Sequence, residues 1–311
     1  MRTLRTIAPE HSSLVMTAAR SVLRKPRFGV VAYGIGRCVT AGASRDDLTL
    51  NVYVRRKLAT PRAHVPDLSV TIGRRTFRVI PNIIATGKTP RAGAGGSPNY
   101  SGVHSGAVIS TGGAQPARGA IAAVLLSGGA PTHILTAAHL VPSGSIGADL
   151  LAAASPAASP VVVANVSLDF LASDGVDACL AQLTVDGVAM VTADGPPLTD
   201  LIAEDQSWSQ PVRGFLATAN DYSISTSTTD HALDAKMASG IRGSYWLDDV
   251  VGTVGSITNA GDSGTILCAG SSNEIAVGVC SGEFTTHSVF EPFQRVMRLS
   301  AQYSGTLFSL S

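Results

Sequence analysis

The chain has 311 residues, of which 45% are hydrophobic and 14% charged, and its formal net charge is +1. This composition is typical of a globular protein with a substantial core, and the near-neutral charge gives no electrostatic reason to expect nucleic acid or an acidic membrane as a partner. No run of about 18 apolar residues is present, so no membrane span is predicted.

The first third of the chain predicts a small α+β unit. Apolar residues recur at helical spacing over residues 10–25, up to Pro26. Two pairs of β-rich segments follow, one joined by a polar loop and the other by a short turn: 29–39 and 48–54 around a loop at 41–47, then 68–72 and 76–80 around Gly73-Arg74-Arg75. We therefore expect an N-terminal unit over residues 1–87 and a Gly- and Pro-rich linker, or an irregular entry into the next domain, over residues 88–118.

The remainder, residues 119–311, consists of short β segments separated by Gly, Ser, Asp and Pro. The segments are 120–126, 133–137, 161–166, 178–185, 212–218, 250–254, 265–268 and 275–279. Helical periodicity is scarce until residues 289–299, which predict a C-terminal helix. The spacing of the segments favours closed or sandwiched antiparallel sheets.

Three motifs occur in this region in the order His, Asp, Ser. They are Thr136-Ala137-Ala138-His139, Val176-Asp177-Ala178-Cys179-Leu180 and Gly261-Asp262-Ser263-Gly264. In a nucleophilic triad a serine attacks a carbonyl, an imidazole takes its proton, and a buried carboxylate orients the imidazole. His139 ends one apolar run and Asp177 begins another, so each is expected at the end of a buried strand.

On these motifs the chain resembles the trypsin-like serine peptidases of the chymotrypsin fold, over roughly residues 103–300. The resemblance implies a mainly β fold, a double antiparallel β-barrel, to which this chain adds a small N-terminal α+β unit and a C-terminal helix. It also implies that His139 is the general base, Asp177 its orienter and Ser263 the nucleophile. The pattern of the N-terminal strands resembles that of a bacterial and plant subgroup of intracellular trypsin-like proteins, which implies a bacterial intracellular type of this family.

The glycine-rich serine motif also predicts an oxyanion hole. The backbone N–H groups of Gly261 and Ser263 could point into one such hole, because glycine lets the backbone approach a ligand closely. The Ile-Val-Gly-Gly terminus of relatives activated by cleavage, which pairs with the aspartate before the serine, has no counterpart here. Asp262 must find another partner, the hole must form without one, or it is collapsed until an effector or a cut rearranges it.

The expected substrate pocket is apolar. By the resemblance its floor falls on Ile257 with Thr258 beside it, and the opposite wall falls around Ser281 and Gly282. A buried cation without a carboxylate partner is costly, so we expect a small or medium apolar residue at the scissile position. Glu283 would reverse this preference if its carboxylate reached the pocket.

Neither a metal nor another cofactor is predicted. The four cysteines, Cys38, Cys179, Cys268 and Cys280, are irregularly spaced, unlike a disulfide framework or a zinc site. The last three lie in apolar runs, where free cysteine usually behaves as a small buried hydrophobe. No signal-peptide pattern is evident, and we expect a cytoplasmic protein with reduced thiols.

Several alternatives remain open from the sequence. Asp174, which precedes Gly175, competes with Asp177 but is typical of a turn residue, and His133 is expected to be structural. Besides an active endopeptidase on protein or peptide substrates, the motifs are compatible with a latent or silent binding scaffold, an effector peptidase in a bacterial defence system, or a hydrolase of small esters. An activating partner is possible, and the sequence does not specify the oligomeric state.

Overall fold

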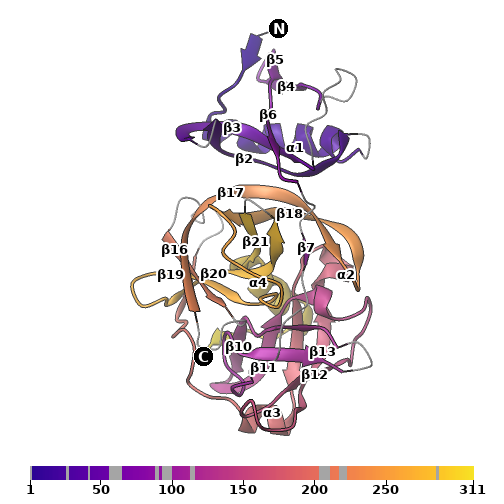
Figure 1. The fold of residues 1–311 in the computed structure, drawn as a ribbon, viewed down its shortest axis with the longest axis vertical. Coiled ribbons are helices and arrows are strands. Elements are labelled where there is room, and N and C mark those ends of the chain that lie inside the picture. The colour runs from indigo at the N-terminus through magenta and orange to yellow at the C-terminus, as the bar shows by residue number, and fades with distance from the viewer. Residues whose placement is uncertain are drawn as a thin grey trace.

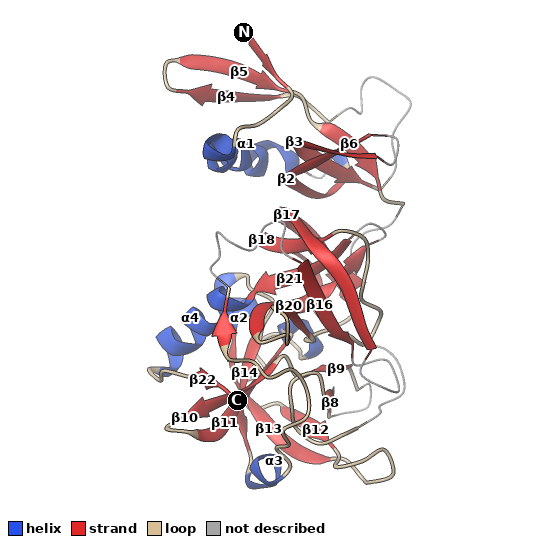
Figure 2. Cartoon of the chain, turned by 90° about the vertical axis from the view of Figure 1, so that its left-hand side faces the viewer, coloured by secondary structure: helices blue, strands red, loops and turns tan. Residues whose placement is uncertain are grey.

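The computed structural model describes residues 2–25, 28–40, 43–55, 65–87, 91–92, 100–112, 116–202, 211–216, 223–284 and 287–311. These residues form three sheets that follow one another along the longest axis of the molecule, with the N-terminal unit at one end (Figure 1). The predicted fold class is confirmed, because the chain is mainly β, its two large sheets are curled and largely antiparallel, and a helix lies near the C-terminus (Figure 2).

The N-terminal unit begins with a small sheet and one helix. The strands are β1 (Arg2–Leu4), β4 (Leu68–Ile72) and β5 (Arg75–Val79), and a 3-10 turn (Pro9–His11) leads into helix α1 (Ser12–Leu23). Val15, Ala19 and Leu23 lie four residues apart on one buried face of α1, which explains why this segment is helical. The predicted helix and second hairpin are confirmed.

The first predicted hairpin is longer than expected. Strands β2 (Val30–Thr40) and β3 (Ala43–Val54) pair as far as Thr40 and Ala43, so most of the predicted loop at 41–47 is strand, while residues 41 and 42 lie outside the described part. Antiparallel pairing supplies hydrogen bonds that a polar composition does not reveal. Strand β2 also pairs with β17, and β6 (Asn82–Ala85) pairs with β3.

The eight-stranded sheet carries the first two motifs. Its order is β22-β10-β11-β14-β13-β12-β8-β9, and all of its pairings are antiparallel. The strands are β8 (Val108–Thr111), β9 (Arg118–Ala120), β10 (Ala123–Ser127), β11 (Ala130–Thr136), β12 (Asp149–Ala152), β13 (Val161–Asp169), β14 (Cys179–Leu183) and β22 (Ser309–Leu310). Strand β8 and the first residue of β9, Arg118, therefore form within the segment 88–118 that was predicted to be linker or irregular entry.

The eleven-stranded sheet carries the serine motif and continues into the N-terminal unit. Its main path is β16-β19-β20-β21-β18-β17-β2-β3-β6, with β7 and β15 paired beside it. Its remaining strands are β7 (Arg91–Ala92), β15 (Asp200–Leu201), β16 (Pro211–Leu216), β17 (Ser223–Ser239), β18 (Gly243–Thr253), β19 (Ile266–Ala269), β20 (Ile275–Phe284) and β21 (His287–Pro292). Of the segment predicted as strand at 212–218, residues 217 and 218 lie outside the described part.

The predicted C-terminal helix begins later than expected. Helix α4 (Phe293–Ser304) follows strand β21, so residues 289–292 are strand and not helix. Every residue of β21 is buried, including the polar Ser288 and Glu291, so this segment lacks the alternation of apolar and polar residues that marks a half-buried strand. Two short helices, α2 (Phe170–Asp174) and α3 (Val185–Ala189), interrupt the strands of the second third of the chain.

A shared apolar cluster holds the two large sheets together. It includes Leu135 of β11, Ile266 of β19 and Phe293 of α4, none of which is exposed. Because β11 ends just before the His motif and β19 begins just after the Ser motif, this packing brings the motifs to one junction.

Candidate active site

His139 lies in a 3-10 turn (Ala138–Leu140) that follows the end of β11. The last strand residue, Thr136, is unexposed, and its hydroxyl donates to the Ala120 carbonyl at 2.6 Å. The strand thus delivers the imidazole just beyond its own end, as the sequence predicts.

Asp177 lies beside His139 because the strand that follows it, β14, pairs with β11. Residues Thr136 and Cys179 are partners in the β11–β14 ladder. Asp177 Oδ2 lies 2.7 Å from His139 Nδ1, and the His139 backbone N–H donates to Asp177 Oδ1 at 2.9 Å. A carboxylate only accepts hydrogen bonds, so Nδ1 carries the proton and Nε2 is left as the acceptor.

Ser263 lies in the loop that leads into β19. The Ala120 N–H donates to its carbonyl at 2.7 Å, and the next residue, Gly264, donates to Cys280 O at 2.8 Å. Gly264 has a φ of +85°, and a Cβ there would lie 2.4 Å from Ala120 O and 3.0 Å from Ala137 N. This close approach requires glycine, and it holds the serine loop against the strand end that carries His139.

Asp262 has a partner within its own loop. Its Oδ2 accepts the Asn259 backbone N–H at 2.8 Å, while its own N–H donates to Asn259 O at 3.1 Å. Gly261 precedes it with a φ of +104°, a conformation that favours glycine. Asp262 is thus hydrogen-bonded without a freed terminal amine, and the loop places Gly261 two residues before Ser263.

The three motif residues are enclosed. Ser263 is 2% exposed, His139 is 1% exposed and Asp177 is 0% exposed. His139 Nε2 is buried and has no hydrogen-bond partner in the described part of the chain. The nitrogen that would take a proton from a nucleophile is therefore shielded from solvent and not engaged by another described group.

Two groups that bind Asp177 were not predicted. The Tyr245 hydroxyl of β18 donates to Asp177 Oδ2 at 3.1 Å, and Glu291 Oε1 of β21 accepts the Asp177 backbone N–H at 2.9 Å. Burial raises the pKa of Glu291 to about 8, against the opposing effect of Arg295. Neither residue belongs to a recognisable motif, so no sequence signal could have found them.

The predicted substrate-pocket residues lie near strands β20 and β21 of the eleven-stranded sheet. The backbone N–H groups of Ile257 and Thr258 donate to Ser288 Oγ at 2.9 and 3.0 Å, and Ser288 pairs with Glu283 in the β20–β21 ladder. Ser281 and Gly282 are buried in β20 beside them. The Glu283 carboxylate accepts the Ser256 hydroxyl at 2.6 Å, next to Ile257.

Asp174 and His133, the alternatives that the sequence offers, contact groups outside the candidate site. Asp174 ends α2 and accepts the hydroxyl of Tyr303 at 3.1 Å, and Gly175 after it has a φ of +68°. His133 packs edge-on against Phe308, with ring centroids 5.0 Å apart. The four cysteines form no disulfide, and burial raises the pKa of Cys179, Cys268 and Cys280, which confirms that these three behave as buried apolar residues.

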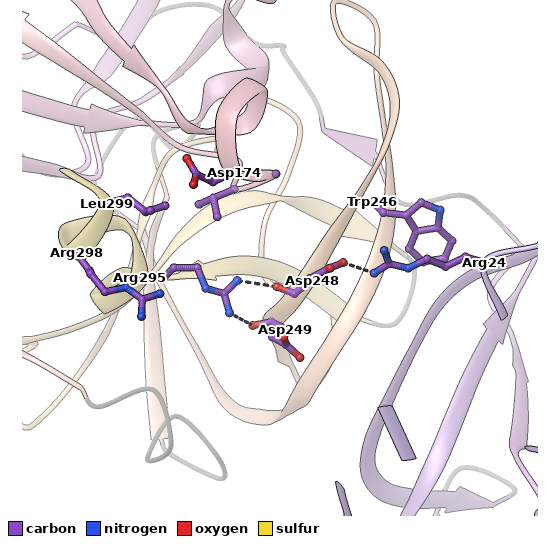
Figure 3. A pocket seen from close by; sticks show the side chains of 10 residues that line it. Arg24, Asp174, Trp246, Asp248, Asp249, Arg295, Arg298 and Leu299 are labelled. Carbon is purple, nitrogen blue, oxygen red and sulfur yellow. Dashed lines mark hydrogen bonds and ion pairs between the residues drawn. The ribbon is translucent and has the colours of Figure 1, made fainter. Parts of the chain in front are cut away.

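A pocket of about 320 Å³ is lined in part by Val176, the residue before Asp177 (Figure 3). Its lining comes from α2, β18, α4 and the residues just after α1 and α2, and includes Trp246 and Arg298. In Figure 3, Arg295 reaches the backbone of Asp248 and Asp249, while Asp248 is bound by Arg24. No predicted substrate-pocket residue lines it.

Within the described residues no cluster of three or more His, Cys, Asp or Glu side chains could hold a metal ion. Among the same residues, no helix has the length and apolar character that a bilayer span requires.

A scan against models of known protein families finds no match, and a search of curated proteins finds none either. Several solved structures are similar. One, described as a glutamic acid specific serine protease with a histidine triad in substrate binding, is 20% identical over 67% of this chain and 100% of its own, with a TM-score of 0.46.

Thermobifida fusca Protease A is 16% identical over 71% of this chain and 100% of its own, with a TM-score of 0.42. Nocardiopsis Protease is 14% identical over 70% of this chain and 99% of its own, with a TM-score of 0.43. Because these similarities are low, the roles of individual residues rest on the geometry of this chain alone.

Proposed function

We propose that the chain is a serine endopeptidase that forms an acyl-enzyme on Ser263, with His139 as general base and Asp177 as its orienter. The observation that supports it most is the pair of hydrogen bonds from His139 to Asp177, at 2.7 and 2.9 Å, which leaves the buried Nε2 as an acceptor. Nε2 takes the Ser263 proton as Oγ attacks the peptide carbonyl and returns it to the leaving amine, and an activated water then hydrolyses the ester.

The developing oxyanion would be bound by the backbone N–H groups of Gly261 and Ser263. The turn between them is held by Asp262, whose carboxylate accepts the Asn259 N–H. An already hydrogen-bonded Asp262 supports a hole that forms without cleavage of the chain.

The substrate is a protein or peptide with a small or medium apolar residue at the scissile position. Ile257, Thr258, Ser281 and Gly282 would line its pocket. Glu283 is hydrogen-bonded to Ser256, which occupies part of its carboxylate and reduces its capacity to bind a basic side chain. A peptide library should therefore be cleaved after apolar residues, and cleavage after Arg or Lys would contradict this assignment.

Covalent labelling by a fluorophosphonate tests the proposal. We expect one adduct by intact mass, on Ser263, and none with Ser263→Ala, while His139→Ala reduces the labelling rate by several orders of magnitude. Ser300→Ala is the matched control, since it removes another buried serine hydroxyl, in helix α4 and outside the candidate site. Equal labelling of wild type and Ser263→Ala would exclude Ser263 as the nucleophile.

A specific observation also favours a latent form of this peptidase. Extended peptides bind proteins by pairing with a free strand edge, and the edge of β20 beside the predicted pocket is occupied. Strand β7 (Arg91–Ala92) pairs with Glu283 of β20 and, on its other side, with Ala238 and Ser239 of β17. Together with the 2% exposure of Ser263, this pairing supports restricted access.

Arg91→Pro tests the latent form, because proline removes a backbone donor from the β7 pairing. In a latent enzyme this variant is labelled by the fluorophosphonate at least about tenfold faster than the wild type. Equal and rapid labelling of both proteins would support the active peptidase and contradict latency.

A further inference from the structure

Tyr245 is the third donor to the Asp177 carboxylate. Its hydroxyl donates to Oδ2 at 3.1 Å, the same oxygen that lies 2.7 Å from His139 Nδ1. Asp177 is unexposed, so bulk water cannot replace this donor. Burial, with the Asp177 charge, raises the pKa of Tyr245, and the phenol therefore remains a donor throughout the neutral range.

The hairpin that carries Tyr245 is anchored beside the triad. At its turn, Arg242 donates to the carbonyls of Ala138 and Val141 at 2.9 and 2.5 Å, on both sides of His139. Arg242 also binds Asp169 at 2.7 Å, and the exposed fraction of both side chains is 4%. The β17–β18 hairpin thus contacts the turn of His139 through Arg242 and Asp177 through Tyr245.

The same hairpin is held at its far side by the N-terminal helix. Arg24, at the C-terminal cap of α1, binds Asp234 of β17 and Asp248 of β18, as Figure 3 shows for Asp248. A second buried hydroxyl expected near the site, Ser281 Oγ, has no hydrogen-bond partner in the described part of the chain. Among the described side chains, Tyr245 is the one whose hydroxyl donates a hydrogen bond to the Asp177 carboxylate.

We infer that Tyr245 is a positioning residue for the Asp177–His139 pair. The inference rests on the proposed function, because it assigns Tyr245 a part in presenting His139 Nε2 to Ser263. Its hydroxyl fixes the direction of Oδ2 and takes up part of its negative charge. Without it, the carboxylate is less well oriented, and His139 Nε2 is presented less accurately to Ser263.

Two variants test this role. Tyr245→Phe removes the hydroxyl and keeps the ring, and Tyr303→Phe is the matched control, because Tyr303 also donates to an aspartate at 3.1 Å, namely Asp174 outside the triad. We expect Tyr245→Phe to slow fluorophosphonate labelling of Ser263 by roughly 10- to 100-fold. Tyr303→Phe should leave the labelling rate unchanged.

A second measurement does not require activity. The His139 Nδ1 proton should give a far-downfield ¹H NMR resonance that is lost in Asp177→Asn. We expect Tyr245→Phe to displace this resonance and Tyr303→Phe to leave it in place. Incorporation of 3-fluorotyrosine, a stronger donor, should displace it in the opposite direction and covers the case in which Tyr245→Phe does not fold.

The outcomes separate the two proposals. If Tyr245→Phe matches Tyr303→Phe in labelling rate and in the position of the resonance, the positioning role is overturned. If the wild type is not labelled, but the His139 Nδ1 resonance moves in Tyr245→Phe and not in Tyr303→Phe, the positioning role is supported and the active peptidase is contradicted.

Discussion

At the scale of single residues, the candidate site depends on buried polar groups that satisfy one another. Asp177 accepts hydrogen bonds from His139 Nδ1, the His139 backbone and Tyr245, and its own N–H donates to Glu291. A buried carboxylate without such donors would be costly, so these bonds fix both its charge and its direction.

Glu291 makes the stability of the protein depend on pH. Its pKa is raised from 4.5 to about 8 by burial, against the effect of Arg295. Because the folded state binds the extra proton, this contribution to stability is complete below about pH 4.5 and is lost as the pH rises through 8. Relative to Glu291→Gln, the free energy of unfolding of the wild type should fall by roughly 2 to 4 kcal/mol between pH 5 and 9.

Urea unfolding of both proteins at several pH values measures this difference. Arg298→Gln, a charge-removing change on the neighbouring helix, is the control. Parallel stability curves for wild type and Glu291→Gln would contradict the raised pKa.

Gly264 tests the close approach of the serine loop. In Gly264→Ala the new Cβ would lie 2.4 Å from Ala120 O at a φ of +85°, whereas Gly255→Ala has a φ of +77° and no atom within 4 Å. Both changes carry the left-handed backbone cost of about 1 to 2 kcal/mol, but only the first displaces Ser263. Fluorophosphonate labelling should fall at least about tenfold in Gly264→Ala and stay unchanged in Gly255→Ala.

At the scale of elements, ion pairs attach helix α1 to the β17–β18 hairpin. Arg20 binds the unexposed Asp234 through two hydrogen bonds, of 2.8 and 3.0 Å, and Arg24 adds a third at 2.9 Å. Burial alone would raise the pKa of Asp234, but the bonds from Arg20 and the Asp249 N–H hold it below its usual value. The helix therefore supplies the counter-charge for a carboxylate inside the large sheet.

Removing Arg20 should destabilise the protein by about 2 to 4 kcal/mol, less than the full cost of breaking a buried pair because Arg24 still binds Asp234. The control is Arg78→Ala, which breaks the ion pair with Asp67 at the surface, where such pairs contribute less than about 1 kcal/mol. Chemical denaturation of Arg20→Ala and Arg78→Ala measures both values. Equal losses of unfolding free energy in the two variants would show that the ion pair with the buried Asp234 contributes no more than one at the surface.

At the scale of the whole molecule, the N-terminal unit is continuous with the second large sheet. Strand β2 pairs with β17 from Ala32 to Ile35, opposite Ala232 to Ala235. The predicted boundary at residue 87 therefore separates segments that share a sheet, and removing residues 1–87 would leave the edge of β17 unpaired and Asp234 without Arg20 and Arg24.

A chain lacking residues 1–87 should associate or aggregate through this exposed strand edge. Size-exclusion chromatography with light scattering measures its state, and thermal melting should show a lower midpoint than that of the full chain. A chain lacking only residues 1–5 is the control, since it loses β1 from the separate small sheet. A truncated chain that is monomeric and melts like the full protein would refute this dependence.

The elements that were predicted well are those with strong local patterns. The face of α1, the turn between β4 and β5, and the strands leading to His139 and from Asp177 follow from residue spacing alone. Strand β21 was taken for helix because burial on both faces removes the alternation that distinguishes a strand. Strand β17 and the start of β18 were not predicted, because residues 223–231 are almost all polar although they pair in a long hairpin.

For this protein, the sequence by itself determined the class of fold and three candidate reactive residues, because order and local context carry that information. Only the tertiary structure decided what surrounds them. Tyr245 and Glu291 bind Asp177 across 68 and 114 residues of chain, β7 occupies the edge of β20, and Arg20 neutralises Asp234. These contacts arise where separate sheets and a helix pack together, and no local pattern specifies which distant side chain fills a buried position.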